Sequence, residues 1–167
     1  FFKDKEIAVV GGGDSALEEA LFLTTYASKV YLIHRRDSLR ASDIMQQRVF
    51  DNPKIEVLWN SVVSEIHGDS KLEEIVLTDT VTGATRDMKL DGLFIAIGSD
   101  PRIEMVKDQL EITDQNTIAV QGRSSKTSLP GVFAAGDVID PTYRQAIIAA
   151  GSGAVAALDA QHYLENL

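Results

Sequence analysis

The stretch that decides the fold is residues 6–20, which read EIAVVGGGDSALEEA. Its first five residues predict a short buried strand, which the three glycines break. From Asp14 to about Ala27 the apolar side chains recur at helical spacing, and Ser15 with Glu18 fits a Ser-x-x-Glu capping box at the helix start. A second buried strand follows at Val30–Ile33. The chain therefore opens as a βαβ unit, which implies a parallel sheet with a right-handed crossover.

The rest of the chain predicts an α/β fold in two parts. A second helix is expected at about 40–51, and Pro53 prevents it from continuing. After a boundary near Gly98–Arg102 a thinner part follows, with a final helix from Tyr143 to about Leu164. Short strands are predicted at 55–58, 62–66, 72–77, 86–90, 93–97, 118–120 and 132–135. The expected architecture is a Rossmann-like domain, built as a parallel sheet with helices plus a small antiparallel sheet, followed by a partial second domain.

Composition excludes several classes of function. The chain has 167 residues, of which 44% are hydrophobic and 25% charged, the profile of a soluble globular protein. Its net charge of −9 makes nucleic acid an unfavourable partner, and no apolar run has the length of a membrane span. The chain contains no cysteine, so it can perform no thiol chemistry of its own. We expect a cytoplasmic protein.

The glycine-rich turn indicates a dinucleotide site. Gly11-x-Gly13-x-x-Ala16 lies between a strand and a helix, the setting in which such a turn binds a pyrophosphate. The first glycine permits the tight turn, and the second lets the backbone approach the phosphates. The small third residue lets the helix pack on the strand, so that its N-terminus faces the anion. Gly12, Asp14 and Ser15 belong to the same candidate site.

The end of the second predicted strand favours NADP over NAD. Units that prefer NAD carry an acidic residue about 20 residues after the glycines. Here that place reads His34-Arg35-Arg36, and Arg40 follows one turn later. Guanidinium groups bind a 2′-phosphate through forked, charge-assisted hydrogen bonds, whereas a carboxylate would repel it. His34 is either part of this site or a packing residue bonded to the backbone.

A third motif lies near the C-terminus. An apolar strand runs into Gly136-Asp137, and a helix begins near Tyr143–Ala146. A carboxylate at a strand end can accept hydrogen bonds from ribityl hydroxyls, and a helix N-terminus can face the N1–C2 region of a flavin. A plain turn is the alternative reading of the Gly-Asp pair.

Taken in order, these motifs resemble the bacterial low-molecular-weight thioredoxin reductases. The resemblance extends from Phe1 to Leu167 and is specific as an ordered set. It rests on GGGDSALEEA at 11–20, HRRDSLR at 34–40, GLFIAIG at 92–98, PGVFAAGDV at 130–138, YRQA at 143–146 and AAGSG at 149–153.

The resemblance implies a subunit in which an NADPH domain is inserted into an FAD domain. NADPH reduces FAD, FAD reduces a Cys-x-x-Cys disulfide, and the dithiol reduces thioredoxin. Residues 1–99 match the NADPH domain and residues 100–167 the C-terminal part of the FAD domain, and the intact protein is expected to be a homodimer. The residues that match the NADPH site are Gly11, Gly12, Gly13, Asp14, Ser15, Ala16, Arg35, Arg36 and Arg40. The stretch from Asp137 to Ala146, with Arg144 and Gln145, matches the C-terminal FAD contacts. His34, Ile97, Gly98 and Gly136 are further candidate cofactor-binding residues.

The chain departs from the family in what it lacks. The family's Cys-x-x-Cys and the first half of its FAD domain precede the segment that begins here at Phe1. We therefore expect a fragment of a longer protein that is inactive by itself. Two alternatives remain, namely a piece of a cysteine-free ferredoxin- or flavodoxin-NADP reductase of the same architecture, and a non-catalytic NADPH-binding module.

Overall fold

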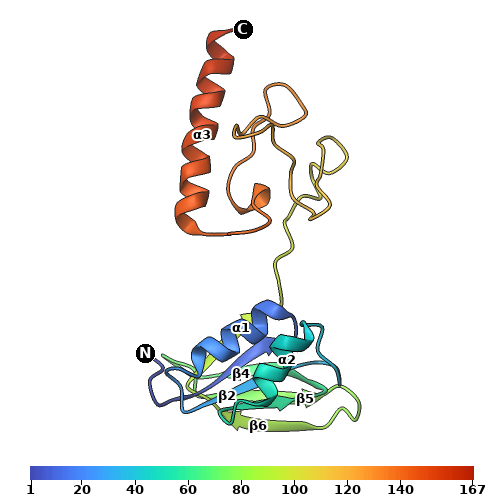
Figure 1. Ribbon diagram of the computed structural model, residues 1–167, viewed down its shortest axis with the longest axis vertical. Coiled ribbons are helices and arrows are strands. Elements are labelled where there is room, and N and C mark those ends of the chain that lie inside the picture. Colours follow the sequence, from blue (N-terminus) through green and yellow to red (C-terminus); the bar gives the residue numbers. More distant parts are fainter. The chain divides into compact units, whose positions relative to one another are not determined.

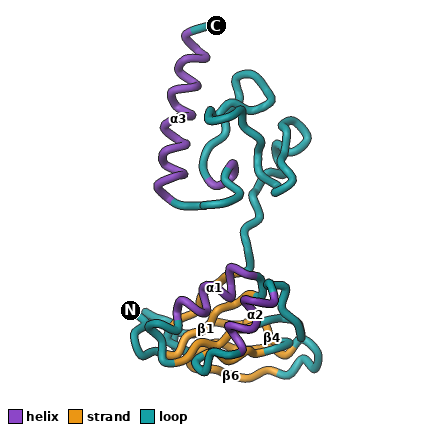
Figure 2. The backbone as a smooth tube through the Cα atoms, in the orientation of Figure 1, coloured by secondary structure: helices purple, strands orange, loops and turns teal.

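The chain divides into two compact units in a computed structural model that describes residues 1–167 (Figure 1). The first unit is Phe1–Gly98 and the second is Ser99–Leu167. Strands are confined to the first unit, whereas the second consists of loops and one long helix (Figure 2).

A four-stranded parallel sheet forms the centre of the first unit. Its strands are β1 (Glu6–Gly11), β2 (Lys29–Ile33), β3 (Ile55–Leu58) and β7 (Gly92–Ala96), in the order β3-β2-β1-β7. All three pairings are parallel, which confirms the predicted βαβ opening. The carboxyl ends of β1, β2 and β7 therefore meet at one edge. The order reverses beside β1, since β2 lies on one side of it and β7 on the other.

Two different layers cover the faces of this sheet. Helices α1 (Asp14–Leu23) and α2 (Asp43–Phe50) cover one face, where Ile7 and Val9 of β1 are fully buried. Ala8, between them, belongs to the core on the opposite face, as alternation along a strand requires. There β4 (Ser61–His67), β5 (Glu74–Asp79) and β6 (Thr85–Lys89) form an antiparallel sheet. The predicted α/β fold with a small antiparallel sheet is confirmed.

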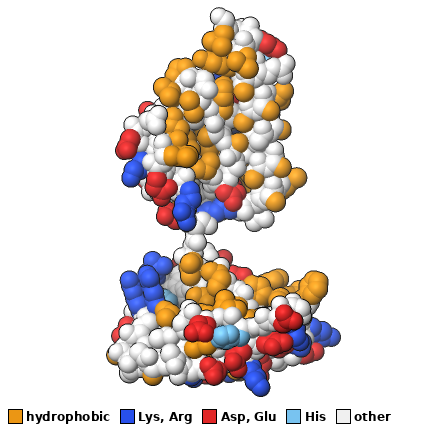
Figure 3. Space-filling view, turned by 180° about the vertical axis from the view of Figure 1, so that it is seen from behind, with side chains coloured by type: hydrophobic (Ala, Val, Ile, Leu, Met, Phe, Trp, Pro, Cys, Tyr) orange, Lys and Arg blue, Asp and Glu red, His pale blue; other side chains and the backbone are white.

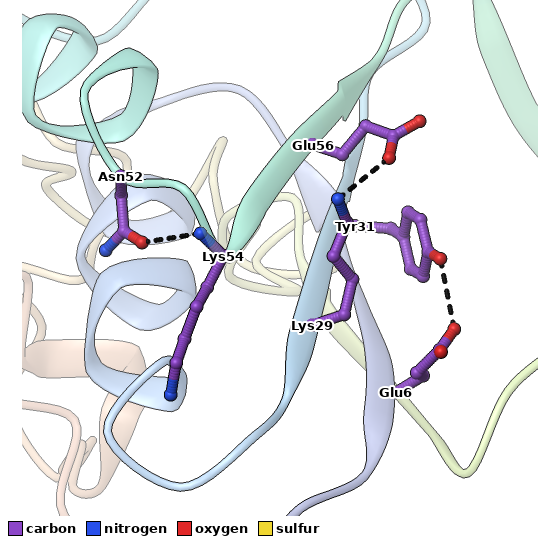
Figure 4. Close-up of polar contacts among 6 residues, drawn as sticks. All are labelled: Glu6, Lys29, Tyr31, Asn52, Lys54 and Glu56. Carbon is purple, nitrogen blue, oxygen red and sulfur yellow. Dashed lines mark hydrogen bonds and ion pairs between the residues drawn. The ribbon is translucent and has the colours of Figure 1, made fainter.

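Polar contacts join β2 to both of its neighbours (Figure 4). The Tyr31 hydroxyl donates to the Glu6 carboxylate at 3.0 Å, and Lys29 pairs with Glu56 at 3.0 Å. Partial burial, followed by the bond to Glu6, raises the pKa of the Tyr31 hydroxyl. Glu6 and Lys29 are the first residues of their strands. These bonds therefore leave the opposite edge, where the strands end, free for other contacts.

Both helices of the first unit are shorter than predicted. Helix α1 ends at Leu23 rather than near Ala27, because the hydroxyls of Thr24 and Thr25 donate to carbonyls of its last turn, both at 2.6 Å. Helix α2 begins at Asp43 rather than Arg40, because the amides of Arg40 and Ala41 donate to the Gly12 carbonyl. The predicted capping box at Ser15 is also wrong. Gly13 is the N-cap of α1, and no side chain caps the helix.

The second unit has little regular structure besides α3 (Ala146–Glu165) and a short 3₁₀ turn at Asp137–Ile139. The strands predicted at 118–120 and 132–135 are wrong. Only isolated bridges occur there, between Ile112 and Ile118 and between Lys126 and Phe133. A strand needs a partner along its length, and within this unit neither segment has one. The core is correspondingly small, with Ile103, Leu110, Ile118 and Ala134 as its buried members.

Helix α3 is attached to its unit by hydrogen bonds at Asp159 and Ser152 and by the contact of Tyr163 with Phe133. Ser125 donates to the Asp159 carboxylate through its amide and its hydroxyl, both at 2.8 Å. The Gly136 amide donates to the Ser152 hydroxyl at 2.8 Å, which forms a second attachment. No residue of α3 is buried, and hydrophobic side chains spread over the face of this unit seen in Figure 3. None of the helices combines the length and the apolar character that crossing a bilayer requires.

The attachment through Asp159 should fail in acid. The Ser125 amide, and then its hydroxyl, hold the pKa of the Asp159 carboxyl below its usual value of 3.8. The stabilisation that this contact contributes is complete at pH values above 3.8. It is lost as the pH falls through the lower pKa of the folded state, because the unfolded state binds the proton first. The protection of the Ser125 amide from hydrogen exchange, measured against an unstructured peptide at the same pH, should decrease over this range.

The test variant is Asp159→Ala, and the control is Asp114→Asn. Asp159→Ala should exchange rapidly at Ser125 already at neutral pH. Asp114 is exposed and makes no side-chain hydrogen bond, so Asp114→Asn should behave as the wild type. Protection of Ser125 that does not depend on Asp159 would show that other contacts hold the helix.

Candidate functional site

A cavity of about 490 Å³ opens at the edge where the parallel strands of the first unit end. It borders the end of β1, where the strand order reverses, the place at which open α/β sheets bind their ligands. Its polar wall contains two loops, namely the glycine loop (residues 11–16) and the arginine loop (residues 34–42). The apolar wall comes from β4 and the end of β7. The lining residues are Val10, Gly11, Gly12, Ile33, His34, Arg35, Arg40, Ser61, Val62, Val63, Ile66, Leu93, Ile95 and Ile97.

The three glycines have different surroundings. A Cβ atom on Gly11 would overlap the Ala96 carbonyl of β7 and the side chain of Ala16, which is fully buried. One on Gly12 would overlap the ring of His34. A Cβ on Gly13 would meet nothing within 4 Å. Gly11 and Gly12 are thus needed for packing, whereas the space beside Gly13 is open to a ligand.

The start of α1 is available for an anion. Gly13 is the N-cap with φ −100° and ψ 176°, an extended conformation, and no side chain bonds to the amides of the first turn. Uncapped amides and the positive end of the helix dipole attract phosphate groups. Asp14 and Ser15 begin this turn and are both exposed.

The arginine loop is fastened to the glycine loop through the backbone. The Arg40 amide donates to the Gly12 carbonyl at 2.7 Å, and the Ala41 amide donates to the same oxygen at 3.2 Å. The side chains of Leu39 and Ala41, on either side of Arg40, are buried in the core beneath the helices. The backbone on both sides of Arg40 is thereby fixed, while its own side chain points away from the core.

His34 also joins the two loops. Its side chain is buried, with Nδ1 3.0 Å from the Gly11 carbonyl oxygen and Nε2 2.9 Å from the Ser38 carbonyl oxygen. A histidine ring held between two backbone carbonyl groups fits the packing alternative. His34 also lines the cavity, so it supports the floor of the site.

The three arginines of the loop present free charges. Arg35, Arg36 and Arg40 are all exposed, and none forms an ion pair with a carboxylate. Arg35 and Arg40 line the cavity, whereas Arg36 lies outside its lining. Most other lysines and arginines of the chain also form no ion pair, so what distinguishes this loop is the grouping of three guanidinium groups at the edge of the sheet.

Two polar residues near the arginine and flavin motifs escaped the sequence analysis. Ser42 donates its amide and hydroxyl to the Asp14 carboxylate, at 3.0 and 2.8 Å. Asp140 accepts the amides of Thr142, Tyr143 and Arg144 at 2.9, 2.9 and 2.8 Å, which lowers the pKa of its carboxyl. The Asp-Pro-Thr sequence at 140–142 is typical of a turn and could have revealed the role of Asp140.

The remaining predicted residues lie at the end of β7 and in the second unit. Ile97 lines the cavity, and Gly98 follows with φ +97°. In the second unit Gly136 has φ +85°, and Asp137 is exposed. Gln145 is the N-cap of α3 and makes no capping bond, so the start of this helix at Ala146 is open as well. Arg144, just before it, has φ +49°, which the Asp140 bonds hold in place.

The tight packing at Gly12 and the open space at Gly13 can be tested by measuring the stability of variants. Gly12→Ala should lower the free energy of unfolding of the first unit by about 1–3 kcal/mol, because the new methyl group overlaps His34. Gly13→Ser should change it by less than about 0.5 kcal/mol, since its side chain enters open space at an N-cap position where serine is favoured. Denaturant unfolding measures both. Equal destabilisation by the two variants would contradict the open space at Gly13.

Comparisons with known proteins identify the family. Residues 2–153 match the pyridine nucleotide-disulphide oxidoreductase family. The whole chain is 58% identical to a thioredoxin reductase of Streptomyces clavuligerus, covering 52% of that protein. It is 54% identical to thioredoxin reductase 2 of Arabidopsis thaliana, with 99% of this chain and 44% of the relative covered. A solved thioredoxin reductase from Streptococcus pyogenes superimposes with a TM-score of 0.84 at 46% identity, over 100% of this chain and 55% of that one.

The chain spans about half the length of the curated relatives it matches. These matches confirm the resemblance to thioredoxin reductases that the ordered motifs indicated. The chain belongs to the pyridine nucleotide-disulphide oxidoreductase family, and the relatives it resembles are thioredoxin reductases.

Proposed function

We propose that this chain supplies the NADPH-binding portion of a flavin-dependent thioredoxin-disulfide reductase. The observation that carries the proposal is the arrangement at the edge of the sheet, where open space at Gly13 adjoins a loop with three unpaired arginines. The first supports binding of a pyrophosphate and the second binding of a 2′-phosphate. The identity with thioredoxin reductases supports the assignment of the reaction.

Residues at this edge of the sheet, inside and beside the cavity, would each bind a different part of the nucleotide. The amides at the start of α1 would bind the pyrophosphate beside Gly13. Arg35, Arg36 and Arg40 would hold the 2′-phosphate through forked hydrogen bonds. Ile97 and Gly98, at the end of β7, would lie near the nicotinamide. His34 would support the floor of the site without touching the reacting atoms.

The second unit would contribute to an FAD site. Asp137 is exposed and can accept hydrogen bonds from ribityl hydroxyls, and the uncapped start of α3 at Gln145–Ala146 can face a flavin carbonyl. Gly136 and Arg144 would shape the backbone on either side. The flavin, when bound, would accept a hydride from NADPH. The residues present fit only the ribityl and flavin end, because the one glycine-rich phosphate loop of the chain is assigned to NADPH.

The disulfide step would take place elsewhere in the protein. This chain has no cysteine, so it cannot itself carry electrons from the flavin to thioredoxin. A cysteine-free ferredoxin- or flavodoxin-NADP reductase would also suit that composition, but the thioredoxin reductase relatives favour the first reading. We further propose thioredoxin as the substrate of the whole protein, a homodimer as its assembly and the cytoplasm as its location.

The proposal predicts a preference between nucleotides. The wild-type chain should bind NADPH more tightly than NADH, and added salt should narrow the difference because the contacts are charged. Arg35→Ala/Arg36→Ala should weaken NADPH binding by about 1–3 kcal/mol and leave NADH binding nearly unchanged. Calorimetric titration measures both affinities.

The matched control is Arg102→Ala/Arg123→Ala, which removes the same charge from exposed positions in the second unit. It should keep the wild-type preference. Equal affinities of the wild-type chain for the two nucleotides would refute the proposed selectivity.

The glycine loop can be tested separately. Gly13→Val should abolish binding of both NADPH and NADH, because a branched side chain would fill the space that the pyrophosphate needs. Loss of the glycine N-cap should cost about 1 kcal/mol, which leaves the first unit folded. Circular dichroism checks the fold, and Ala84→Val, in an exposed turn, serves as the control. Normal binding by a folded Gly13→Val chain would show that the nucleotide lies elsewhere.

The cofactor assignment makes a third prediction. The purified chain should retain little FAD and should not reduce thioredoxin with NADPH, since it offers one phosphate loop and no cysteine. A second polypeptide can be made from the part of a thioredoxin reductase relative that this chain does not cover. Adding it to the chain should restore flavin binding and activity. Stoichiometric flavin absorbance in the chain alone would contradict the proposed division of the FAD site.

A further inference from the structure

The carboxylate of Asp14 joins the starts of two helices. Asp14 is the first residue of α1, and one of its oxygens, Oδ1, accepts both the amide and the hydroxyl of Ser42, at 3.0 and 2.8 Å. Ser42 is the N-cap of α2 and the last residue of the arginine loop. These two bonds connect the glycine loop to the arginine loop across 28 residues of sequence.

Arg40 lies between this contact and a second one. Its amide is bonded to the Gly12 carbonyl at 2.7 Å, and Ser42, two residues later, is bonded to Asp14. Because the Arg40 side chain is exposed and has no partner, these backbone contacts decide where its guanidinium group can reach. Arg35 and Arg36 are held differently. Their carbonyls accept the Thr80 hydroxyl and the Asn60 amide, each at 3.2 Å.

A negative charge at this position needs a reason. A carboxylate at the start of α1 lies beside the space proposed for phosphate groups, and its charge alone would oppose their binding. The Ser42 amide, and then the Ser42 hydroxyl, lower the pKa of the Asp14 carboxyl, and both donate to its Oδ1 atom. A carboxylate in the first turn also interacts favourably with the helix dipole, so the inference rests on the bonds to Ser42 and not on the charge.

We infer that Asp14 is a positioning residue for nucleotide specificity, because it fixes the arginine loop against the glycine loop and so places Arg40 to read the 2′-phosphate. This inference rests on the proposed NADPH site and adds a residue that acts on the selectivity of that site without touching the ligand. It also separates two groups of arginines, since Arg35 and Arg36 do not depend on Asp14.

The test compares the NADPH and NADH affinities of the full wild-type chain with those of five variants. Asp14→Ala removes the acceptor and should lower NADPH affinity about tenfold, while NADH affinity changes less than about twofold. Asp14→Asn keeps an acceptor oxygen without the charge and should retain most of the preference. Arg40→Ala should reproduce the loss, and adding Asp14→Ala to it should cause no further loss of preference. Asp43→Ala removes the acidic residue at the same place in α2, where it makes no bond, and should behave as the wild type.

The outcomes are distinguishable. If Asp14→Ala and Asp14→Asn both bind NADPH more tightly, Asp14 acts through its charge and the inference is wrong. An equal loss for NADPH and NADH in Asp14→Ala would indicate a merely structural role and would also overturn it. Additive losses in the Asp14→Ala/Arg40→Ala chain would show that Asp14 does not act through Arg40. A wild-type chain without any preference would instead refute the proposed NADPH site.

Discussion

The contact on which the first unit depends is the approach of β1, α1 and β7 at Gly11. No side chain fits at this residue, because the Ala96 carbonyl and the Ala16 side chain already occupy the space. Close packing of this kind is intolerant of even one added carbon. It brings the end of β1 next to the end of β7 and sets the direction in which α1 leaves the sheet. The open start of that helix is thereby placed at the carboxyl edge of the sheet.

The exposed arginines lie at the same edge of the sheet, so the cavity there is suited to an anionic ligand. The Gly12 carbonyl accepts two backbone amides of the arginine loop, and the ring of His34 occupies the space where a side chain of residue 12 would lie. Asp14 adds the bonds to Ser42. Because these contacts involve the backbone, they leave the arginine side chains free for a ligand. The small antiparallel sheet covers the opposite face and supplies the apolar wall of the cavity.

Sequence reasoning predicts most of this fold, because the βαβ opening is encoded by local patterns of apolar residues and glycines. It fails where distant contacts decide. Helix α2 starts late because Gly12 binds the amides of Arg40 and Ala41, which no local pattern reveals. The strands expected in the second unit are absent because no partner strand lies beside them there. The residue types of the candidate site could be read from the sequence, but the pairing of Asp14 with Ser42 could not, since it joins loops far apart in the chain.

The central claim is that the edge of the parallel sheet binds NADPH through separate phosphate contacts. A crystal structure of the chain with bound NADP⁺ tests it most directly. The account predicts the pyrophosphate beside Gly13 at the start of α1, and the 2′-phosphate within hydrogen-bonding distance of Arg40 and at least one of Arg35 and Arg36. A nucleotide bound away from the glycine loop, or a 2′-phosphate that faces solvent without an arginine partner, would contradict it.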